Sequence, residues 1–202
     1  LKSCGAKLKM IASASGASGT QCAKKYGISQ STTDYRAILE DDEIDTVFIT
    51  TRHGSHSKLI IESLNSGKNT FVEKPLALNI EQLNQIVDSF EEQQKKSNAP
   101  ILTVGFNRRF SPHILKIKDS IGESQSPINI IANMNAGFIS STHWVHDLES
   151  GGGRIIGEAC HLIDICVFLT GSLVKSVCAS SLGVSPTINT DNASIILKFE
   201  NG

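Results

Sequence analysis

The strongest constraint on the fold is the alternation of apolar strands and helical segments between residues 46 and 106. Three short segments have the composition of buried parallel strands, and they are Thr46–Thr50, Asn69–Glu73 and Ile101–Phe106. Helical segments lie between them, with Ser55 and Asn79 as expected N-terminal caps. The second of these helices should pack through an apolar face made of Ile80, Leu83, Ile86, Val87 and Phe90. Such an alternation predicts right-handed β-α-β units and an α/β fold with a parallel sheet.

The residues before position 46 extend the same pattern. We expect a strand over Leu8–Ala14, a small-residue loop over Ser15–Gly19 and a helix over Thr20–Tyr26. Thr33 is expected to cap a further helix that runs to Glu40. Leu1 is not a start methionine, and the sequence stops just after a strand-like segment. We therefore expect a piece of a longer protein, cut at both ends.

The pattern changes after Pro112, where strands begin to follow one another without helices. The expected elements are a helix over 112–121, a strand over 128–135, a helix over 155–169, and strands over 174–182 and 193–199. This order is typical of an α+β domain with a mainly antiparallel sheet. The sequence therefore predicts two domains, residues 1–110 and residues 111–202.

Polar residues follow each of the three strands of the first domain. Parallel strands bring their carboxyl ends to one edge of the sheet, and ligands bind at that edge. The residues expected there are Arg52, His53, Glu73, Lys74, Asn107 and Arg108. Pro75 stops the second of these strands, so Lys74 lies in the loop at the edge. A functional lysine and a solvated loop lysine are about equally compatible with this position.

Composition and charge exclude several classes of protein. The 202 residues carry a net charge of −1, which argues against a nucleic-acid or membrane surface. Forty per cent of the residues are hydrophobic, enough for a sizeable core, and no apolar run approaches a membrane span. The five scattered cysteines are typical of reduced thiols. We therefore expect a cytoplasmic protein. We also expect no metal site, because Cys160, His161 and Cys166 match no standard zinc spacing.

Several motifs occur in an order that is specific when they are taken together. They are the strand Thr46–Thr50 with His56, the turn Ser66–Lys68, Glu73-Lys74-Pro75, Phe106–Phe110, Gly151–Gly153 and Cys160–Asp164. This series resembles the Gfo/Idh/MocA family, the relatives of glucose–fructose oxidoreductase and inositol dehydrogenase. The resemblance covers nearly the whole chain. It implies a Rossmann domain, here without its first strand and glycine-rich loop, joined to an incomplete α+β domain.

The resemblance implies an NAD(P)-dependent dehydrogenase that transfers a hydride between nicotinamide and a carbinol carbon of a sugar, sugar derivative or cyclitol. Lys74 would contact the substrate hydroxyl, and His161 would act as acid and base. Because His161 lies on an otherwise apolar helix, a buried structural histidine is the alternative interpretation. The rival function is a catalytically silent protein that binds a dinucleotide or sugar on the same fold.

The sequence departs from the family pattern beside the catalytic histidine. The family has an aspartate four residues before it, and that position is Gly157. Glu158 is the next residue, but its side chain points in a different direction around the helix. The sequence leaves open whether Glu158 replaces the aspartate. Asp164, one turn after His161, is either a residue that orients the histidine or a surface residue.

The cofactor residues are expected at the strand ends. The residues that we assign to NAD or NADP are Ser13, Ser15, Thr50, Thr51, Arg52, His53, His56, Glu73 and Lys74. No acidic residue follows the strand expected over Leu8–Ala14, and this favours NADP over NAD. Without the glycine-rich loop, we expect the fragment itself not to hold the cofactor. Arg52 is equally compatible with a surface ion pair.

The expected partner is a small polyol or sugar. Asn107, Arg108 and Trp144 are the candidate substrate residues, and Trp144 is equally compatible with a core or interface position. By resemblance, the second sheet would form contacts between subunits, which implies a homodimer or homotetramer.

Overall fold

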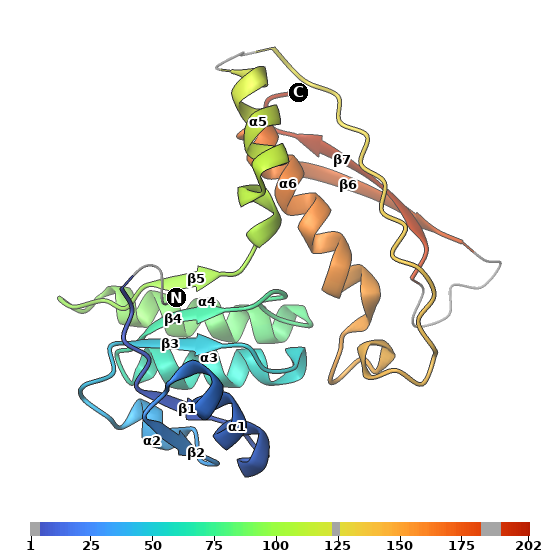
Figure 1. Ribbon diagram of the computed structural model, residues 1–202. Coiled ribbons are helices and arrows are strands. Elements are labelled where there is room, and N and C mark those ends of the chain that lie inside the picture. The colour runs from blue at the N-terminus through green and yellow to red at the C-terminus, as the bar shows by residue number, and fades with distance from the viewer. Residues whose placement is uncertain (1–4, 123–125, 183–190) are drawn as a thin grey trace. The chain divides into compact units, whose positions relative to one another are not determined.

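The computed structural model describes residues 5–122, 126–182 and 191–202 (Figure 1). Its internal contacts divide the chain into two compact units. The first contains the described residues up to Ile49, with Lys58–Phe71 and Gln85–Thr103. The second contains Thr50–Ser57, Val72–Asn84 and the described residues from Val104 onward. The loops that follow two strands of the parallel sheet therefore belong to the second unit.

The parallel sheet has the elements of a Rossmann-like fold. In chain order these are β1 (Met10–Ala12), α1 (Gly16–Tyr26), β2 (Gln30–Thr32), α2 (Arg36–Leu39), β3 (Thr46–Ile49), α3 (His56–Asn65), β4 (Asn69–Val72), α4 (Ile80–Gln94) and β5 (Leu102–Val104). β1 pairs with β2 in parallel, and a second sheet has the strand order β3-β4-β5. The predicted Rossmann-like parallel sheet is confirmed.

Helix α3 shows how the sequence fills the core. His56, Ile60 and Leu64 recur every four residues, and each is completely buried. Helix α4 departs from its predicted apolar face, because Ile80 and Val87 are exposed. Its buried positions are Ile86, Ser89 and Gln93. The last two are polar and donate hydrogen bonds to Oδ1 of Asn65, which explains why polar residues are tolerated there.

The second unit carries a separate antiparallel sheet, as predicted. Its elements are α5 (Pro112–Ile121), a 3₁₀ turn (Trp144–His146), a π-helical turn (Ile155–Ala159), α6 (Cys160–Thr170), β6 (Val174–Ser181) and β7 (Ala193–Phe199). β6 and β7 pair antiparallel, and α5 packs against α6. Local signals set the helix ends: Ser111 caps α5 ahead of Pro112, and Gly171 ends α6 in the left-handed conformation. None of the described helices is long and apolar enough to cross a membrane.

Three further local predictions were wrong. Residues 128–135 form no strand in the described structure; instead they line an open cavity of about 1760 Å³ together with β7. The loop expected over Ser15–Gly19 is helical, because α1 begins at Gly16 with Ser15 as its N-cap. The capping residue expected at Thr33 is not used, since α2 begins at Arg36 and the Arg36 amide bonds to the Asp34 carboxylate.

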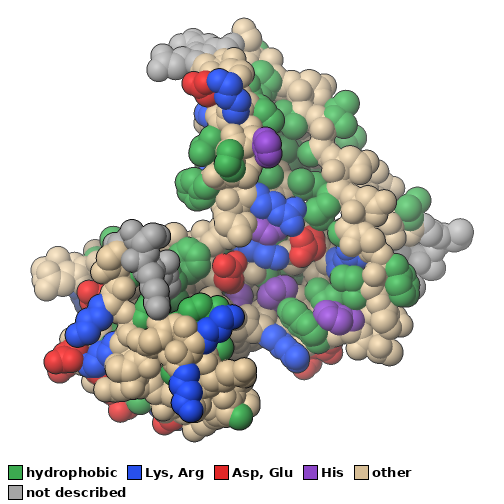
Figure 2. All heavy atoms as spheres, in the orientation of Figure 1, with side chains coloured by type: hydrophobic (Ala, Val, Ile, Leu, Met, Phe, Trp, Pro, Cys, Tyr) green, Lys and Arg blue, Asp and Glu red, His purple; other side chains and the backbone are tan. Residues whose placement is uncertain are grey.

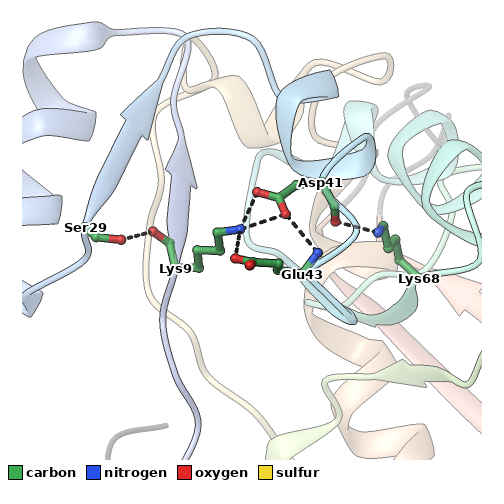
Figure 3. A network of polar contacts seen from close by, with 5 residues as sticks. All are labelled: Lys9, Ser29, Asp41, Glu43 and Lys68. Atoms are coloured by element: carbon green, nitrogen blue, oxygen red, sulfur yellow. Dashed lines mark hydrogen bonds and ion pairs between the residues drawn. The ribbon is translucent and has the colours of Figure 1, made fainter.

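An ion-pair network lies in the first unit (Figure 3). Lys9 Nζ binds the carboxylates of Asp41 and Glu43, at 2.6 Å and 2.7 Å. Lys68 Nζ donates to the backbone oxygen of Asp41 at 2.8 Å. The hydrogen bonds from Lys9 lower the pKa of both carboxyl groups and raise the pKa of Lys9. The network therefore connects the start of β1 to the loop before β3 and to the turn before β4.

Replacing Lys9 with Met is expected to lower the thermal stability at pH 7 and to do so much less near pH 3. A carboxyl group whose pKa is lowered by folding contributes stability above its unfolded pKa, and loses that contribution as the pH falls through its folded pKa. Asp41 and Glu43 are such groups. Thermal unfolding at both pH values, with the exposed Lys96→Met as control, tests this. An equal loss at pH 7 and pH 3 would contradict the electrostatic account.

Candidate active site

The loops after β3 and β4 are held together by His56. Its Nδ1 lies 2.8 Å from the backbone oxygen of Pro75, and its Nε2 lies 3.1 Å from that of Thr51. The side chain is completely buried. Both ring nitrogens therefore face backbone carbonyls, which makes His56 a residue that fixes the loop carrying Lys74.

Lys74 is held by the π-helical turn of the same unit. Its Nζ donates to the backbone oxygen of Gly157 at 2.6 Å and lies 3.5 Å from Oε1 of Glu158. The side chain is mostly buried, with 16% exposed. On the face shown in Figure 2, several histidine, basic and acidic side chains lie near one another. The predicted residue Lys74 is thus a confined, oriented ammonium and not a solvated loop lysine.

Glu158 faces Lys74 because the helix begins with a π-helical turn. A π-turn holds one more residue than an α-helical turn and changes the direction in which its side chains point. Oε1 of Glu158 approaches Lys74, and Oε2 lies 3.3 Å from the guanidinium of Arg108. The carboxylate that meets Lys74 comes from position 158, and it also meets Arg108.

A neighbouring imidazole accounts for the glycine at position 157. A Cβ built on Gly157 would lie 3.3 Å from Cε1 of His53. The His53 ring itself is fixed, since its Nδ1 lies 2.8 Å from the backbone oxygen of Gly151 and its edge packs on Trp144 with centroids 5.0 Å apart. A side chain at position 157 would therefore make a tight contact with this ring.

His161 is buried, with 4% of its surface exposed. No described residue makes a hydrogen bond with its Nδ1, although that atom is shielded from solvent. Burial lowers the pKa of His161, and the positive charges of Arg108 and Lys74 lower it further. The imidazole is therefore neutral near pH 7, and its buried Nδ1 has no hydrogen-bond partner among the described residues.

Asp164 pairs with Arg109, a residue that sequence analysis did not include in the site. Nε of Arg109 lies 2.9 Å from Oδ2 of Asp164, and the second guanidinium nitrogen binds Oδ1. The hydrogen bond raises the pKa of Arg109, which also lies over the Phe168 ring. The pair connects the 3₁₀ turn Asn107–Phe110 to α6. Only the adjacency of Arg109 to Arg108 in the sequence hinted at this role.

The glycine triplet shapes the wall beside His53. A Cβ on Gly151 would lie 2.5 Å from backbone atoms of Trp144 and Val145, so only glycine fits there. Gly152 has φ of 74°, in the left-handed region. This packing holds Trp144 beside the histidine, with the Arg52 guanidinium 5.3 Å from its ring. The predicted residues Arg52, His53 and Trp144 thus lie together.

The remaining predicted residues lie at strand ends. Thr50, Thr51 and Glu73 follow β3 and β4 in the second unit, whereas Ser13 and Ser15 follow β1 in the first. Ser15 makes no side-chain bond to the N-terminus of α1, whose first turn has no acid. Asn107 is exposed and begins the 3₁₀ turn.

Replacing Glu158 with Gln is expected to shift the acid limb of the pH–activity profile to lower pH. The Glu158 carboxylate raises the pKa of His161, so its removal lowers that pKa further. The other charged groups that act on His161, Arg108, Lys74 and Asp164, stay in place. The pH profile of kcat/KM measures the shift, with the exposed Asp119→Asn as control. An unchanged or higher apparent pKa would contradict the assigned contact.

Among the described residues, no cluster of three or more His, Cys, Asp or Glu side chains could hold a metal ion. The contacts described above bring the carboxylate of Glu158 to the ammonium of Lys74 and to the guanidinium of Arg108.

Comparison with known proteins identifies the chain's relatives. The model of the oxidoreductase family with an NAD-binding Rossmann fold matches residues 2–99, and the model of the GFO/IDH/MocA C-terminal domain matches residues 126–202. The uncharacterized oxidoreductase YrbE of Bacillus subtilis is 29% identical over 97% of this chain and 57% of its own length. The scyllo-inositol 2-dehydrogenase (NAD(+)) of the same organism is 32% identical over 86% of this chain and 49% of its own length.

A solved structure of levoglucosan dehydrogenase in complex with NADH is similar with a TM-score of 0.77 and 25% identity. The match covers 96% of this chain and 55% of that one. The chain thus spans about half the length of the relatives that it matches. With both domain models matched in order, the chain belongs to the Gfo/Idh/MocA family of NAD-binding oxidoreductases.

Proposed function

We propose that the protein is an NAD(P)-dependent dehydrogenase that oxidises a carbinol carbon of a sugar, sugar derivative or cyclitol. The observation that carries this proposal is the buried, neutral His161, whose Nδ1 has no partner in the described structure. It lies within the electrostatic influence of Lys74, which is itself held by Gly157 and Glu158. The imidazole of His161 as base and the ammonium of Lys74 as cation suit a reaction in which a hydroxyl group loses its proton.

The roles of the two side chains follow from this chemistry. His161 takes the hydroxyl proton, because a neutral imidazole near pH 7 is an effective base. The Lys74 ammonium stabilises the negative charge that develops on the oxygen. The backbone oxygen of Gly157 and the carboxylate of Glu158 keep the ammonium in position, and Arg108 binds the other oxygen of Glu158. A bound nicotinamide dinucleotide supplies the hydride acceptor.

The cofactor residues are proposed from the strand ends described above. Ser13 and Ser15 would hold the adenosine end, and the backbone of the segment from Thr50 to His56, with Glu73 and Lys74, would hold the nicotinamide end. Because the first turn of α1 has no acid, the residues fit a ribose 2′-phosphate as well as a diol. Asn107, Arg108 and Trp144 are proposed to contact the substrate.

The organisation of the whole protein is also proposed. Residues 1–110 would form the dinucleotide domain and residues 111–202 part of the substrate domain. The antiparallel sheet would form contacts in a homodimer or homotetramer, and the location would be cytoplasmic.

The test uses the full-length protein. NADH and NADPH are titrated separately by nicotinamide fluorescence, and inositols and sugars are then screened for formation of the reduced dinucleotide. Turnover that is lost in Lys74→Ala and His161→Ala, with dinucleotide binding retained, is the expected result. Tight dinucleotide binding without turnover on any polyol would favour the silent sensor, and absence of binding would overturn both functions.

A further inference from the structure

The hydrogen bond to Gly151 sets the proton position on His53. Nδ1 of His53 lies 2.8 Å from the backbone oxygen of Gly151. A carbonyl oxygen only accepts hydrogen bonds, so Nδ1 carries the proton. In the neutral ring, Nε2 then carries a lone pair and is a hydrogen-bond acceptor.

The ring is also held in place on its other sides. Trp144 meets it edge to face, and the backbone of Gly157 approaches Cε1 so closely that a Cβ there would be 3.3 Å away. Gly157 is the residue whose carbonyl binds Lys74. The His53 ring and the Lys74 ammonium therefore lie against the same residue.

Nε2 of His53 has no hydrogen-bond donor within the part of the chain that the structure describes. The neighbouring His56 is different, because both of its nitrogens face backbone carbonyls. Burial lowers the pKa of His53, and the nearby His56 and Lys74 lower it further, against the opposite effects of Gly151 and Glu158. His53 is thus a neutral, oriented acceptor that the fold itself leaves unused.

We propose that Nε2 of His53 accepts a hydrogen bond from a substrate hydroxyl on the carbon next to the reacting carbinol. The site would then select vicinal diols over lone alcohols. The position supports this role, since His53 lies beside Gly157 and Trp144 at the place where Lys74 is held. The inference rests on the proposed dehydrogenase function and specifies its substrate class.

The test compares two probes that differ by one hydroxyl, cyclohexanol and its trans vicinal diol. Dissociation constants are measured on the full-length protein with saturating dinucleotide, so that the readout does not depend on turnover. In His53→Asn, the shorter amide can still donate to the Gly151 oxygen but has no acceptor at the position of Nε2. The matched control is His113→Asn, which changes an exposed histidine on α5. Histidine nitrogen NMR reports on Nε2 directly.

We expect the preference for the diol to fall about 2- to 10-fold in His53→Asn, the worth of one neutral hydrogen bond. The preference should be unchanged in His113→Asn, and the Nε2 resonance should move with the diol and not with cyclohexanol. An unchanged preference would overturn the proposal. So would an Nε2 shift caused by the dinucleotide alone, since the donor would then belong to the cofactor. If the preference for the diol falls as expected but the protein turns over no polyol, the role of His53 is supported and the proposed dehydrogenase function is overturned.

Discussion

Replacing His161 with Ala is expected to lower kcat by about 10²–10⁴-fold, the usual worth of a general base. The imidazole is buried and neutral, and Nδ1 has no hydrogen-bond partner in the described structure. Alanine is the best helix former, so α6 should persist around the vacated space. Steady-state kinetics on an accepted polyol measure the loss, and the dinucleotide dissociation constant should stay close to its original value.

Two controls separate catalysis from structure in that variant. Added imidazole should restore part of the activity of His161→Ala, because a small base can enter the space that the side chain leaves. The exposed His113→Ala should behave like the original protein. A loss of activity that imidazole does not restore, with a lowered melting temperature, would identify His161 as the structural histidine of the alternative interpretation.

Replacing Lys74 with Met is expected to lower kcat by about 10²–10³-fold, the usual loss when one group that stabilises a developing oxyanion is removed. The ammonium is held by the oxygen of Gly157 and by Glu158, so it needs no reorganisation when negative charge develops. Methionine keeps most of the apolar side chain and removes only the charge. Single-turnover kinetics with deuterated substrate measure the hydride step separately from product release.

Lys74→Arg provides the comparison for that variant. It keeps the charge, but its planar guanidinium cannot reproduce the compact contact with the Gly157 oxygen, so partial activity is expected. If Lys74→Met retained the original rate of the hydride step, Lys74 would bind the cofactor without taking part in the chemistry.

The features that the sequence predicted well depend on local signals. Gly27 and Gly171 end their helices in the left-handed conformation, and Ser111 with Pro112 begins α5. The gathering of polar residues at one edge of the sheet was also predictable, because a proline stops β4 and the carboxyl ends of parallel strands lie at the same edge. By contrast, β2 consists of Gln30, Ser31 and Thr32, and such a short polar strand has no apolar signal.

The features that could not be predicted depend on contacts between distant residues. Segment 128–135 has the composition of a strand, but it does not pair with a strand in the described structure. The pair of Arg109 and Asp164 joins residues 55 positions apart, and neither residue alone indicates the other. The direction of Glu158 depends on a π-helical turn, which ordinary helical periodicity does not foresee.

That turn has a consequence for how this site tolerates changes in chain length. One extra residue in a helical turn acts as an insertion whose effect is confined to the turn itself. Losing one residue from Ile155–Ala159 would therefore leave an ordinary α-helical turn and change the direction of the groups within it, whereas the preceding glycine triplet and α6 would keep their arrangement. Lys74 would lose the Gly157 oxygen, and His53 would lose its neighbour, in the same event. A substitution changes one side chain at a time, whereas a single deletion in this turn would break the contacts of Lys74 and of His53 together.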